Sequence, residues 1–495
     1  MDIFKEEKHR TILEATNEEL LELKDKAKDK LWKPIYHIYP QYGLLNDPNG
    51  LAYFNGKYHV FHQWYPFGVT HGMKHWAHLE SEDLVSWNRL PVAIIPTETY
   101  ESHGAYSGNS IEINEELYLY YTGNIKFDKN NRSANQCLAI MNKDGEIKKY
   151  ENNPIIEGVP NGYTGHVRDP KVFKLKENYY MILGAQRVNE TGTFIMYKSI
   201  DGIKWELIGE LELENFPKEF GYMWECPDYV KIDDKDVLIF SPQGIDEEGN
   251  KYNNIFNVIY AIGKLDIDNL KFKVDSYEEL DKGFDFYAPQ SFKGKDGQAL
   301  LFAWAGMGEF KYPTDKKLWA HCLTFPRELS ISNNKLIQKP AKEILKLSKL
   351  VVSENGIVNK KEIIANDNNT YYLKANLTLN EANNFGINLC SSNEERLELN
   401  FNRENNSVSL NRNKMKNRFI EEYGLTREAE INIDKNIDIE VIVDNSIVEI
   451  FIDGGKITMS TRVFPLEKST GIEIYADNEI RYNYTKHVLN SGILD

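Results

Sequence analysis

Residues 51–62, Leu-Ala-Tyr-Phe-Asn-Gly-Lys-Tyr-His-Val-Phe-His, form a pattern that is typical of a β-hairpin. Two short runs, Leu51–Phe54 and Lys57–His62, flank the pair Asn55-Gly56. Asn-Gly favours the positive φ angles of a type I′ turn, whose twist matches that of paired antiparallel strands. The fold can be inferred from this hairpin because similar hairpins recur along the chain.

Four further hairpins are predicted at a nearly constant spacing. The five hairpins start at residues 51, 110, 171, 229 and 290, so successive starts lie 59, 61, 58 and 61 residues apart. The later four pair the following runs: Ser110–Ile113 with Leu117–Thr122, Lys171–Lys174 with Tyr179–Leu183, Tyr229–Ile232 with Val237–Phe240, and Gln290–Lys293 with Ala299–Trp304. A second repeated pattern, Ser-x-Asp-x-x-x-Trp, occurs at Ser81–Trp87 and Ser199–Trp205.

The length of this repeat indicates the architecture. A repeat of about 60 residues is longer than the usual repeat of a propeller blade, but four short strands with generous loops fit it. The sequence therefore predicts an all-β chain with a five-bladed β-propeller over residues 34–341. Five separate small β domains are the alternative, which the short and regular connections disfavour.

A short helical segment is expected before the propeller, in residues 1–33. Its apolar residues fall three, four or seven positions apart: Leu13, Leu20, Leu23, Ala27 and Leu31. Thr16 and Glu19 fit a capping box, and Pro34 follows the segment. We expect an amphipathic helix that packs on the surface of the main domain.

A second β domain is expected after the propeller, in residues 342–495. The repeat stops there, and alternating runs appear at Tyr371–Leu379, Ile439–Val443 and Ile447–Ile452. About 150 residues of short alternating strands with turn signals predict a two-sheet β-sandwich. We expect it to support the propeller rather than to bind a ligand.

The composition narrows the class of protein. The 495 residues are 41% hydrophobic and 12% aromatic, enough for two or three folding units. A net charge of -16 disfavours a nucleic-acid partner. The four cysteines, Cys137, Cys226, Cys322 and Cys390, have neither metal-site spacing nor the density of a disulfide framework.

The N-terminus and the hydropathy indicate a cytoplasmic protein. The first ten residues are charged where a signal peptide has an apolar core, and no run of 18 apolar residues predicts a membrane span. We therefore expect no membrane partner. Both a monomer and a homodimer remain open, because a sandwich edge or face can support a dimer.

Loops of similar polar character precede four of the five hairpins. Their sequences are Asn46-Asp47-Pro48-Asn49-Gly50, Tyr106-Ser107-Gly108, Arg168-Asp169-Pro170 and Trp224-Glu225-Cys226-Pro227-Asp228. In a propeller the innermost strand of every blade begins at the same end of the central channel. We therefore expect Asp47, Asp169 and Glu225 to converge on one small volume, although each Asp taken alone is more typical of a turn cap.

Clustered carboxyl groups favour glycoside hydrolysis. One carboxylate attacks the anomeric carbon, while the other protonates the leaving oxygen and then activates water. A calcium site is the rival use of such a cluster, but no ligand loop of that spacing is present. Aromatic residues suited to stacking on a sugar lie in or near these loops, although core packing explains each one equally well: Trp64, Tyr65, Trp76, Tyr106, Trp224, Tyr287 and Trp304.

Several motifs together resemble one glycoside hydrolase family, which contains invertases, levanases, inulinases and sucrose-6-phosphate hydrolases. Asn46–Gly50 resembles its sucrase signature, Arg168-Asp169-Pro170 its Arg-Asp-Pro motif, and Glu225-Cys226-Pro227 its Glu-Cys motif. Further matches are Gln63, Tyr106-Ser107-Gly108, Tyr121-Thr122-Gly123-Asn124 and Leu323-Thr324-Phe325-Pro326-Arg327-Glu328-Leu329. The resemblance covers residues 34–340 by motif and implies a five-bladed propeller followed by a β-sandwich.

The resemblance also implies roles for the site residues. Asp47 is then the nucleophile that forms a covalent fructosyl-enzyme, Glu225 the general acid/base, and Asp169 the group that stabilises the transition state. The predicted substrate contacts are Leu44, Leu45, Asn46, Gln63, Trp76, Tyr106, Ser107, Arg168 and Trp304. Neither a metal nor an organic cofactor is expected.

Residues 66–76 are similar to the bacterial intracellular sucrose-6-phosphate hydrolases within this family. Many extracellular members have a tryptophan near the position of His71. His71, Lys74 and His75 are candidates for binding a phosphate on the glucose unit, with structural hydrogen bonds as the alternative. We expect hydrolysis of sucrose 6-phosphate, and of sucrose as a weaker substrate. The alternatives are a general invertase or fructanase on unphosphorylated sugars, and a non-catalytic fructan-binding propeller.

Overall fold

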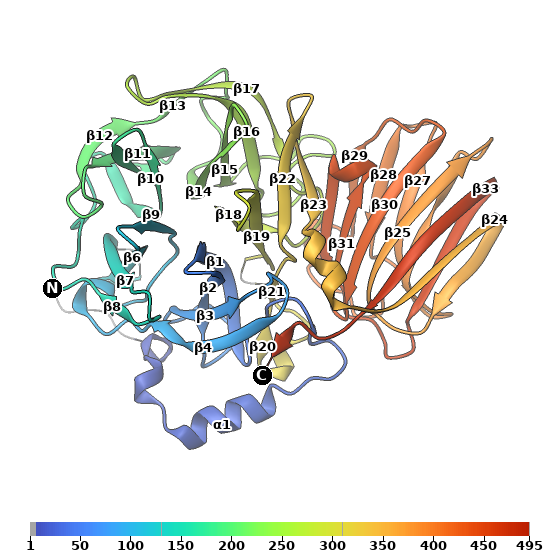
Figure 1. Ribbon diagram of the computed structural model, residues 1–495, viewed down its shortest axis with the longest axis horizontal. Helices are drawn as coiled ribbons and strands as arrows, with labels where there is room; N and C mark the ends of the chain where they lie inside the picture. Colours follow the sequence, from blue (N-terminus) through green and yellow to red (C-terminus); the bar gives the residue numbers. More distant parts are fainter. Residues whose placement is uncertain (1–5, 130, 309, 495) are drawn as a thin grey trace.

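The computed structural model describes residues 6–129, 131–308 and 310–494 (Figure 1). These residues form a β-propeller followed by a C-terminal β-sandwich-like sheet, with few helices. In Figure 1 the propeller lies on the left as a ring of short sheets, and the C-terminal sheet lies on the right. No described helix is long and apolar enough to cross a membrane.

The propeller region contains five separate sheets. The first has the order β20-β1-β2-β3-β4-β34, the second β5-β6-β7-β8, and the third β12-β11-β10-β9. Their bounds are β1 (Gly43–Phe54), β2 (Lys57–Tyr65), β3 (His75–Ser81), β4 (Trp87–Ile94), β20 (Trp319–Ala320), β34 (Ile493–Leu494), β5 (Ser110–Ile113), β6 (Glu116–Lys126), β7 (Arg132–Met141), β8 (Ile147–Lys149), β9 (Tyr163–Leu175), β10 (Asn178–Arg187), β11 (Gly192–Ser199) and β12 (Glu206–Glu210).

The last two sheets complete this region. The fourth has the order β13-β17-β16-β15-β14, and the fifth has the order β18-β19-β22-β23, with β21 also paired to β19. Their bounds are β13 (Glu212–Glu214), β14 (Met223–Ile232), β15 (Lys235–Gln243), β16 (Ile259–Asp266), β17 (Lys271–Glu279), β18 (Tyr287–Lys293), β19 (Ala299–Ala305), β21 (Cys322–Leu323), β22 (Arg327–Ser332) and β23 (Lys335–Pro340).

All five predicted hairpins are confirmed as antiparallel pairs: β1/β2, β5/β6, β9/β10, β14/β15 and β18/β19. In the first hairpin Phe54 pairs with Lys57, and the turn residues Asn55 and Gly56 have φ angles of 47° and 83°. Both turn residues therefore adopt the positive φ that a type I′ turn requires.

The first strand of each hairpin lies on the inside of the ring. Strand β1 contacts β5 and β18, β9 contacts β5 and β14, and β14 contacts β18. These contacts close a circle around a central channel. The starts of the inner strands therefore meet at one end of the channel, as the loop pattern predicted.

The C-terminal domain is sandwich-like, as predicted, and its ten strands form one continuous sheet. Its strands are β24 (Ser348–Asn366), β25 (Thr370–Leu379), β26 (Asn384–Ser391), β27 (Leu397–Asn402), β28 (Ser407–Asn411), β29 (Thr426–Glu430), β30 (Asn436–Asp444), β31 (Ile447–Ile452), β32 (Ile457–Arg462) and β33 (Gly471–Leu489). Strand β33 pairs with β26 through residues 471–476 and with β25 through residues 480–488. Because one long strand belongs to both halves, the sheet folds over on itself and encloses a shared apolar core.

The N-terminal helix α1 (Asn17–Lys26) is shorter than the apolar pattern predicted. Thr16 caps it, with Oγ1 accepting a hydrogen bond of 3.2 Å from the Glu19 amide, but the Glu19 carboxylate pairs with Arg10 instead of completing a capping box. Leu13 lies outside the helix and is 66% exposed. The other helical segments are 3₁₀ turns at Glu7–His9, Ile12–Glu14, Thr99–Glu101, Asp315–Lys317, Lys342–Leu347, Glu421–Tyr423 and Asp453–Gly455.

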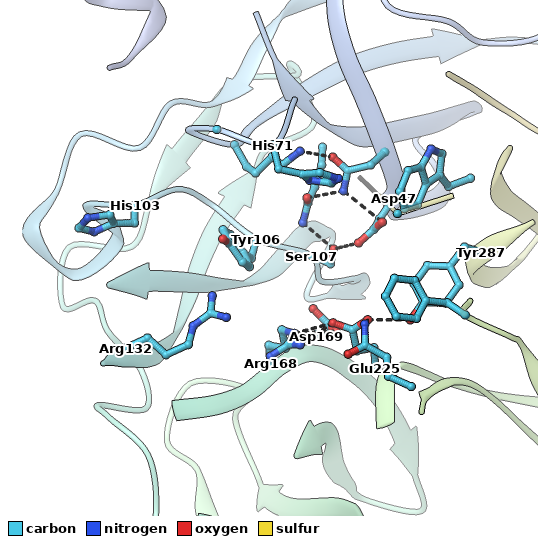
Figure 2. A pocket seen from close by; sticks show the side chains of 18 of the residues that line it. Asp47, His71, His103, Tyr106, Ser107, Arg132, Arg168, Asp169, Glu225 and Tyr287 are labelled. Atoms are coloured by element: carbon cyan, nitrogen blue, oxygen red, sulfur yellow. Dashed lines mark hydrogen bonds and ion pairs between the residues drawn. The ribbon is translucent and has the colours of Figure 1, made fainter. Parts of the chain in front are cut away.

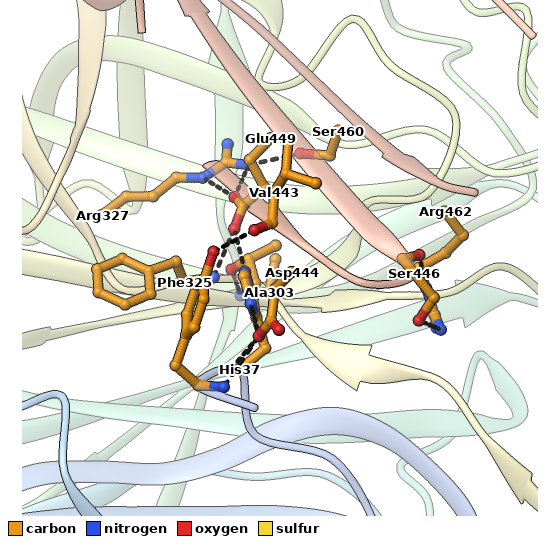
Figure 3. A network of polar contacts seen from close by, with 12 residues as sticks. His37, Ala303, Phe325, Arg327, Val443, Asp444, Ser446, Glu449, Ser460 and Arg462 are labelled. Atoms are coloured by element: carbon orange, nitrogen blue, oxygen red, sulfur yellow. Dashed lines mark hydrogen bonds and ion pairs between the residues drawn. The ribbon is translucent and has the colours of Figure 1, made fainter. Parts of the chain in front are cut away.

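A buried polar network joins the propeller to the C-terminal sheet (Figure 3). Arg327 at the start of β22 binds the carboxylate of Glu449 on β31 with Nε at 3.0 Å and Nη2 at 2.5 Å. Its Nη1 also pairs with Asp281 at 3.0 Å, and all three side chains are fully buried. His37 lies between Asp444 and Glu449, at 2.9 and 3.0 Å.

The chain end reinforces this junction. After β33 the chain returns to the propeller, where β34 pairs in parallel with β4 and places Ile493 opposite Trp87. The Gly492 amide donates to the Ile35 carbonyl, and the Trp87 amide donates to the Gly492 carbonyl. The first and last strands of the described chain, β1 and β34, therefore belong to the same sheet.

Candidate active site

A cavity of about 550 Å³ opens at the end of the channel where the inner strands begin. Figure 2 shows the side chains of Asp47, Asp169 and Glu225 pointing into it from three different sheets. Seven further lining residues lie around these carboxyl groups: Asn46, Gln63, Ser107, Arg168, Gln243, Tyr287 and Trp304. The three acids that are up to about 180 residues apart in sequence therefore share one site, as expected for a propeller.

An irregularity at a proline places each of these loops. Four inner strands break register where a residue precedes proline: Asp47-Pro48, Asp169-Pro170, Cys226-Pro227 and Ala288-Pro289. Proline cannot donate a ladder hydrogen bond, so bulges are where a sheet accepts it. Asp169, Cys226 and Ala288 also have positive φ angles of 64°, 47° and 47°. The same local distortion thus turns successive side chains toward the channel in four sheets.

Asp47 on β1 is held by neutral donors on both carboxylate oxygens. Ser107 Oγ donates to Oδ2, and Asn46 Nδ2 donates to Oδ1 at 3.1 Å. Gln63 connects the two donors, because it accepts from Asn46 at 2.6 Å and donates to Ser107 at 2.6 Å. These bonds fix the direction in which the carboxylate points.

Asp169 on β9 is fixed by backbone groups. Its Oδ2 accepts a hydrogen bond of 3.0 Å from the Cys226 amide, and its own amide donates to Thr122 Oγ1 at 3.0 Å. Cys226 Sγ lies 3.5 Å from Asp169 Oδ2 and 3.9 Å from Asp47 Oδ2. The two aspartates therefore flank the same thiol, which burial keeps protonated by raising its pKa.

Glu225 on β14 accepts hydrogen bonds on both oxygens. Arg168 Nε and Nη2 donate to Oε1 at 2.9 and 2.5 Å, while Gln243 Nε2 and Tyr287 Oη each donate to Oε2 at 2.7 Å. Burial and the Glu225 charge raise the pKa of Tyr287 well above its usual value, so the phenol stays a donor.

Crowding shifts the acid–base behaviour of the aspartates. Burial raises the pKa of Asp169 to about 7; Arg168 opposes the increase, while the charges of Glu225 and Asp47 add to it. Burial also raises the pKa of Asp47, against the hydrogen bonds from Ser107 and Asn46. Burying and crowding carboxyl groups in this way lowers the stability of the folded protein. Raised carboxyl pKa values are therefore typical of functional sites, where the chemistry requires the arrangement.

The predicted substrate contacts fall into two groups. Asn46, Gln63, Tyr106, Ser107, Arg168 and Trp304 line the cavity with the three acids. Leu44, Leu45 and Trp76 do not: their side chains are at most 1% exposed and pack in the propeller core. The Trp76 indole donates to the Tyr106 carbonyl at 3.1 Å, so these three residues support the wall from behind.

The three phosphate candidates also separate. Lys74 lines the cavity, but its Nζ donates to Asn46 Oδ1 at 2.6 Å, next to Asp47. His71 lines the cavity beside Trp304, with ring centroids 6.1 Å apart. His75 does not line it, because its ring nitrogens bond to the Met73 carbonyl and the Ile12 amide. His75 thus makes structural hydrogen bonds.

Sequence reasoning missed several cavity residues. Gln243 lies at the end of β15, opposite the loop of Glu225, and its place in the register could have indicated it. Gly72 lies within the motif of residues 66–76, and the other missed residues come from segments without a local motif: Lys8, His9, His103, Lys126, Arg132, Ile255, Phe256 and Gly308. Only the assembled ring brings them together.

Neither metal ligation nor thiol chemistry has a structural basis in the described residues. No group of three His, Cys, Asp or Glu side chains among residues 6–129, 131–308 and 310–494 is arranged to hold a metal ion. All four cysteines are free, and burial raises the pKa of each thiol. Around the three carboxyl groups, the chemistry available at this site is that of carboxyl groups, the cations Arg168 and Lys74, and neutral hydrogen-bond partners.

Comparison with known families divides the chain into two matched regions. Residues 37–340 match the model of the glycosyl hydrolases family 32 N-terminal domain, and residues 336–490 match the model of the glycosyl hydrolases family 32 C-terminal region. The first match contains Asp47, Asp169 and Glu225.

Individual proteins match over nearly the whole length. A sucrose-6-phosphate hydrolase of Staphylococcus xylosus is 37% identical over 493 residues, covering 99% of both chains. A solved sucrose-6-phosphate hydrolase from Lactobacillus gasseri has a TM-score of 0.90 at 34% identity and covers 99% of this chain and 100% of that one. A Bombyx mori GH32 beta-fructofuranosidase variant, in complex with sucrose, has a TM-score of 0.84 at 29% identity, covering 97% of this chain and 98% of that one.

Proposed function

The chain belongs to glycosyl hydrolases family 32 and is a glycosidase, and from this premise we propose that it hydrolyses the β-fructofuranosyl bond of sucrose 6-phosphate. Sucrose is the weaker substrate in this proposal. The observation that carries it is the meeting of Asp47, Asp169 and Glu225 in one cavity, each held by a different set of donors. Relatives with the printed name sucrose-6-phosphate hydrolase support the choice of substrate.

In the proposed mechanism Asp47 attacks the anomeric carbon of fructose. Its carboxylate is aimed by Ser107 and Asn46, so little reorientation is needed before attack. Glu225 gives a proton to the leaving glycosidic oxygen as the bond between that oxygen and the fructose carbon breaks. It then removes a proton from water, which attacks the fructosyl-enzyme, releases fructose and frees Asp47. The configuration at the anomeric carbon is retained.

Asp169 and Arg168 have supporting roles in this proposal. The Asp169 carboxyl accepts or donates hydrogen bonds to fructose hydroxyls, which its pKa of about 7 allows near neutral pH. Arg168 binds Glu225 and lies 3.9 Å from Asp169, so one cation sits between two acids. The further proposed sugar contacts are five residues that line the cavity: Asn46, Gln63, Tyr106, Ser107 and Trp304.

The proposal extends to the architecture. The five sheets around the channel are five blades of the catalytic propeller, which spans residues 34–341 after an N-terminal helical segment at 1–33. The C-terminal domain, residues 342–495, holds the propeller through the Arg327–Glu449 contact rather than binding sugar. A small sugar is the only partner proposed, for a cytoplasmic monomer or homodimer without metal or organic cofactor.

Turnover on the two sugars tests the function. We expect kcat/KM to be higher for sucrose 6-phosphate than for sucrose; equal values would favour a general invertase. Glu225→Gln is expected to lose about 10²- to 10⁴-fold in turnover while binding is mostly retained. The matched control, Asp234→Asn in the exposed β14–β15 turn, is expected to match wild type. Full activity of Asp47→Asn would exclude the covalent mechanism.

A further inference from the structure

One wall of the cavity is basic, and the proposed mechanism does not use it. Its side chains are those of Lys8, His9, His103, Lys126 and Arg132. The only acids among the cavity residues that the structure describes are the three catalytic carboxyl groups. In a protein with a net charge of -16, such a wall does not follow from composition.

Arg132, at the start of β7, contacts only neutral groups. Its Nη2 donates to Asn124 Oδ1 at 2.7 Å, and its Nη1 lies 3.4 Å from His166 Nδ1. The guanidinium lies 5.8 Å from the centre of the Tyr106 ring, and its Nε is buried without a protein partner. No carboxylate of the described chain forms an ion pair with it within 4.0 Å. Its charge is therefore compensated by no acid at contact distance.

Lys126 adds a second charge at the same place. It ends β6 and stands directly opposite Arg132 in the β6/β7 register. Like charges directly opposite each other on paired strands are destabilising. A bound anion between them would remove this repulsion, since charge-assisted hydrogen bonds from Arg and Lys are among the strongest in proteins.

The N-terminal segment completes the wall. The Lys8 carbonyl accepts a 2.9 Å hydrogen bond from the Met73 amide, and the His9 ring packs edge-on against His103 with centroids 4.6 Å apart. The pKa of His9 is lowered to about 4, mainly by burial and in smaller part by the neighbouring His103 and Lys126. His9 is therefore neutral at pH 7 and offers a hydrogen bond rather than a charge.

The wall lies on the Glu225 side of the site. Arg168 donates to Glu225, and His166 Nδ1 lies 2.9 Å from Arg168 Nη1 and 3.4 Å from Arg132 Nη1. Figure 2 shows Arg132 and His103 on the side of the cavity away from Asp47 and Tyr287. Arg132 is thus connected to Glu225 through His166 and Arg168, whereas Lys74 lies beside Asn46 on the nucleophile side.

We infer that this basic wall binds the phosphate group of the leaving sugar, with Arg132 and Lys126 as its main cationic donors. The inference rests on the proposed function, which puts the leaving hexose phosphate beside Glu225. A phosphate carries close to two negative charges at pH 7 and three acceptor oxygens, which matches a planar guanidinium and an ammonium. In this assignment residues from other loops bind the phosphate, rather than the predicted candidates Lys74 and His75.

The test compares kcat/KM for sucrose 6-phosphate and for sucrose in wild type, Arg132→Met and Lys126→Met. Arg481→Met, at an exposed position of β33, is the matched control. We expect the ratio of the two kcat/KM values to fall about 10- to 100-fold in Arg132→Met, the loss of a hydrogen bond to a charged group. Inhibition of sucrose hydrolysis by glucose 6-phosphate should weaken in parallel, while inhibition by glucose, which lacks the phosphate, should change less.

Each outcome decides the inference. If wild type prefers the phosphorylated sugar and both variants keep this preference, as Arg481→Met is expected to do, the basic wall is not the phosphate site. The proposed function then still stands. Equal use of both sugars by wild type overturns the phosphate preference and the inference together. If Arg132→Met does not fold, as judged by circular dichroism, Lys126→Met carries the test. If wild type cleaves neither sugar, calorimetry with glucose 6-phosphate still tests the wall: unchanged affinity in the variants overturns it.

Discussion

Replacing Arg327 by methionine should destabilise the protein strongly without touching the active site. The guanidinium is fully buried and makes five hydrogen bonds, two of them to the carboxylate of Glu449. Methionine fills a similar volume but supplies no donor. The variant therefore leaves the carboxylates of Glu449 and Asp281 buried without their cation.

The expected cost follows from the burial of both acids. Removing one partner of a buried ion pair costs about 3–5 kcal/mol, because the other charge stays desolvated. Glu449 keeps hydrogen bonds from the Phe325 amide at 2.6 Å and from His37 at 3.0 Å, and Asp281 keeps those from Ser460. These remaining donors argue for the lower half of that range.

Urea unfolding followed by two probes measures the effect. Seven of the eight tryptophans lie in the propeller and the eighth, Trp32, contacts Phe464 at the junction, so their fluorescence reports mainly on the propeller, whereas far-ultraviolet circular dichroism reports on both domains. Because Arg327 is contributed by the propeller and Glu449 by the C-terminal sheet, the two transitions should separate in the variant. In wild type we expect them to coincide.

The control is Arg396→Met, which removes an Arg–Glu pair of 2.8 Å with Glu398 at a position where the arginine is 39% exposed. An exposed pair contributes about 0–1 kcal/mol, so this variant should unfold close to wild type. A loss below about 1 kcal/mol in Arg327→Met, or one equal to that of the control, would refute the view that this pair holds the two domains together.

Three further perturbations address the active site. Ser107→Ala removes a donor that lowers the pKa of Asp47, so the acidic limb of the kcat/KM profile should move to higher pH, with a loss in kcat of roughly tenfold from one charge-assisted hydrogen bond. Lys74→Met should lower kcat/KM for sucrose and for its 6-phosphate by the same factor, because Lys74 holds Asn46 on the nucleophile side; an unequal loss would contradict that placement. The pKa of Asp169 is raised from 3.8 to about 7, so the folded state binds a proton that the unfolded state lacks, and stability falls as pH rises between those values. Asp169→Asn should remove this fall, at about 1.4 kcal/mol per pKa unit, and an equal gain in unfolding free energy at pH 4 and pH 8 would be inconsistent with it.

The propeller could be predicted because its signals are local. Each hairpin is encoded within about a dozen residues by alternation and a turn pair such as Asn55-Gly56, and the constant spacing orders the hairpins. The C-terminal sheet was less predictable. Its two halves share β33, and no local pattern in Gly471–Leu489 states that one strand pairs with β26 first and β25 later.

The catalytic carboxyl groups could be predicted from the repeat, whereas the basic wall could not. Asp47 and Asp169 directly precede the proline of an X-Pro bulge, and Glu225 lies one residue further from its proline, so the repeat brings the three acids together. Lys8 and Arg132 do not lie at equivalent positions of the repeat. Lys8 lies in the N-terminal segment, and Arg132 begins β7, the third strand of the second sheet. Ala288-Pro289 shows an intermediate case: it repeats the X-Pro bulge without a polar side chain, and its equivalence is visible once the period is known.

These observations connect the stability of the frame to the chemistry of the site. Burying three acids in one cavity opposes folding, as the raised pKa values of Asp47 and Asp169 indicate. The X-Pro bulges fix where the acids point, but a bulge does not hold one sheet against the next. That is done by links between inner strands, such as Lys171 with Asp228 at 2.5 Å, and by the junction around Arg327. If this division is right, weakening the junction should lower stability first and should alter kcat/KM only where the propeller itself has begun to open.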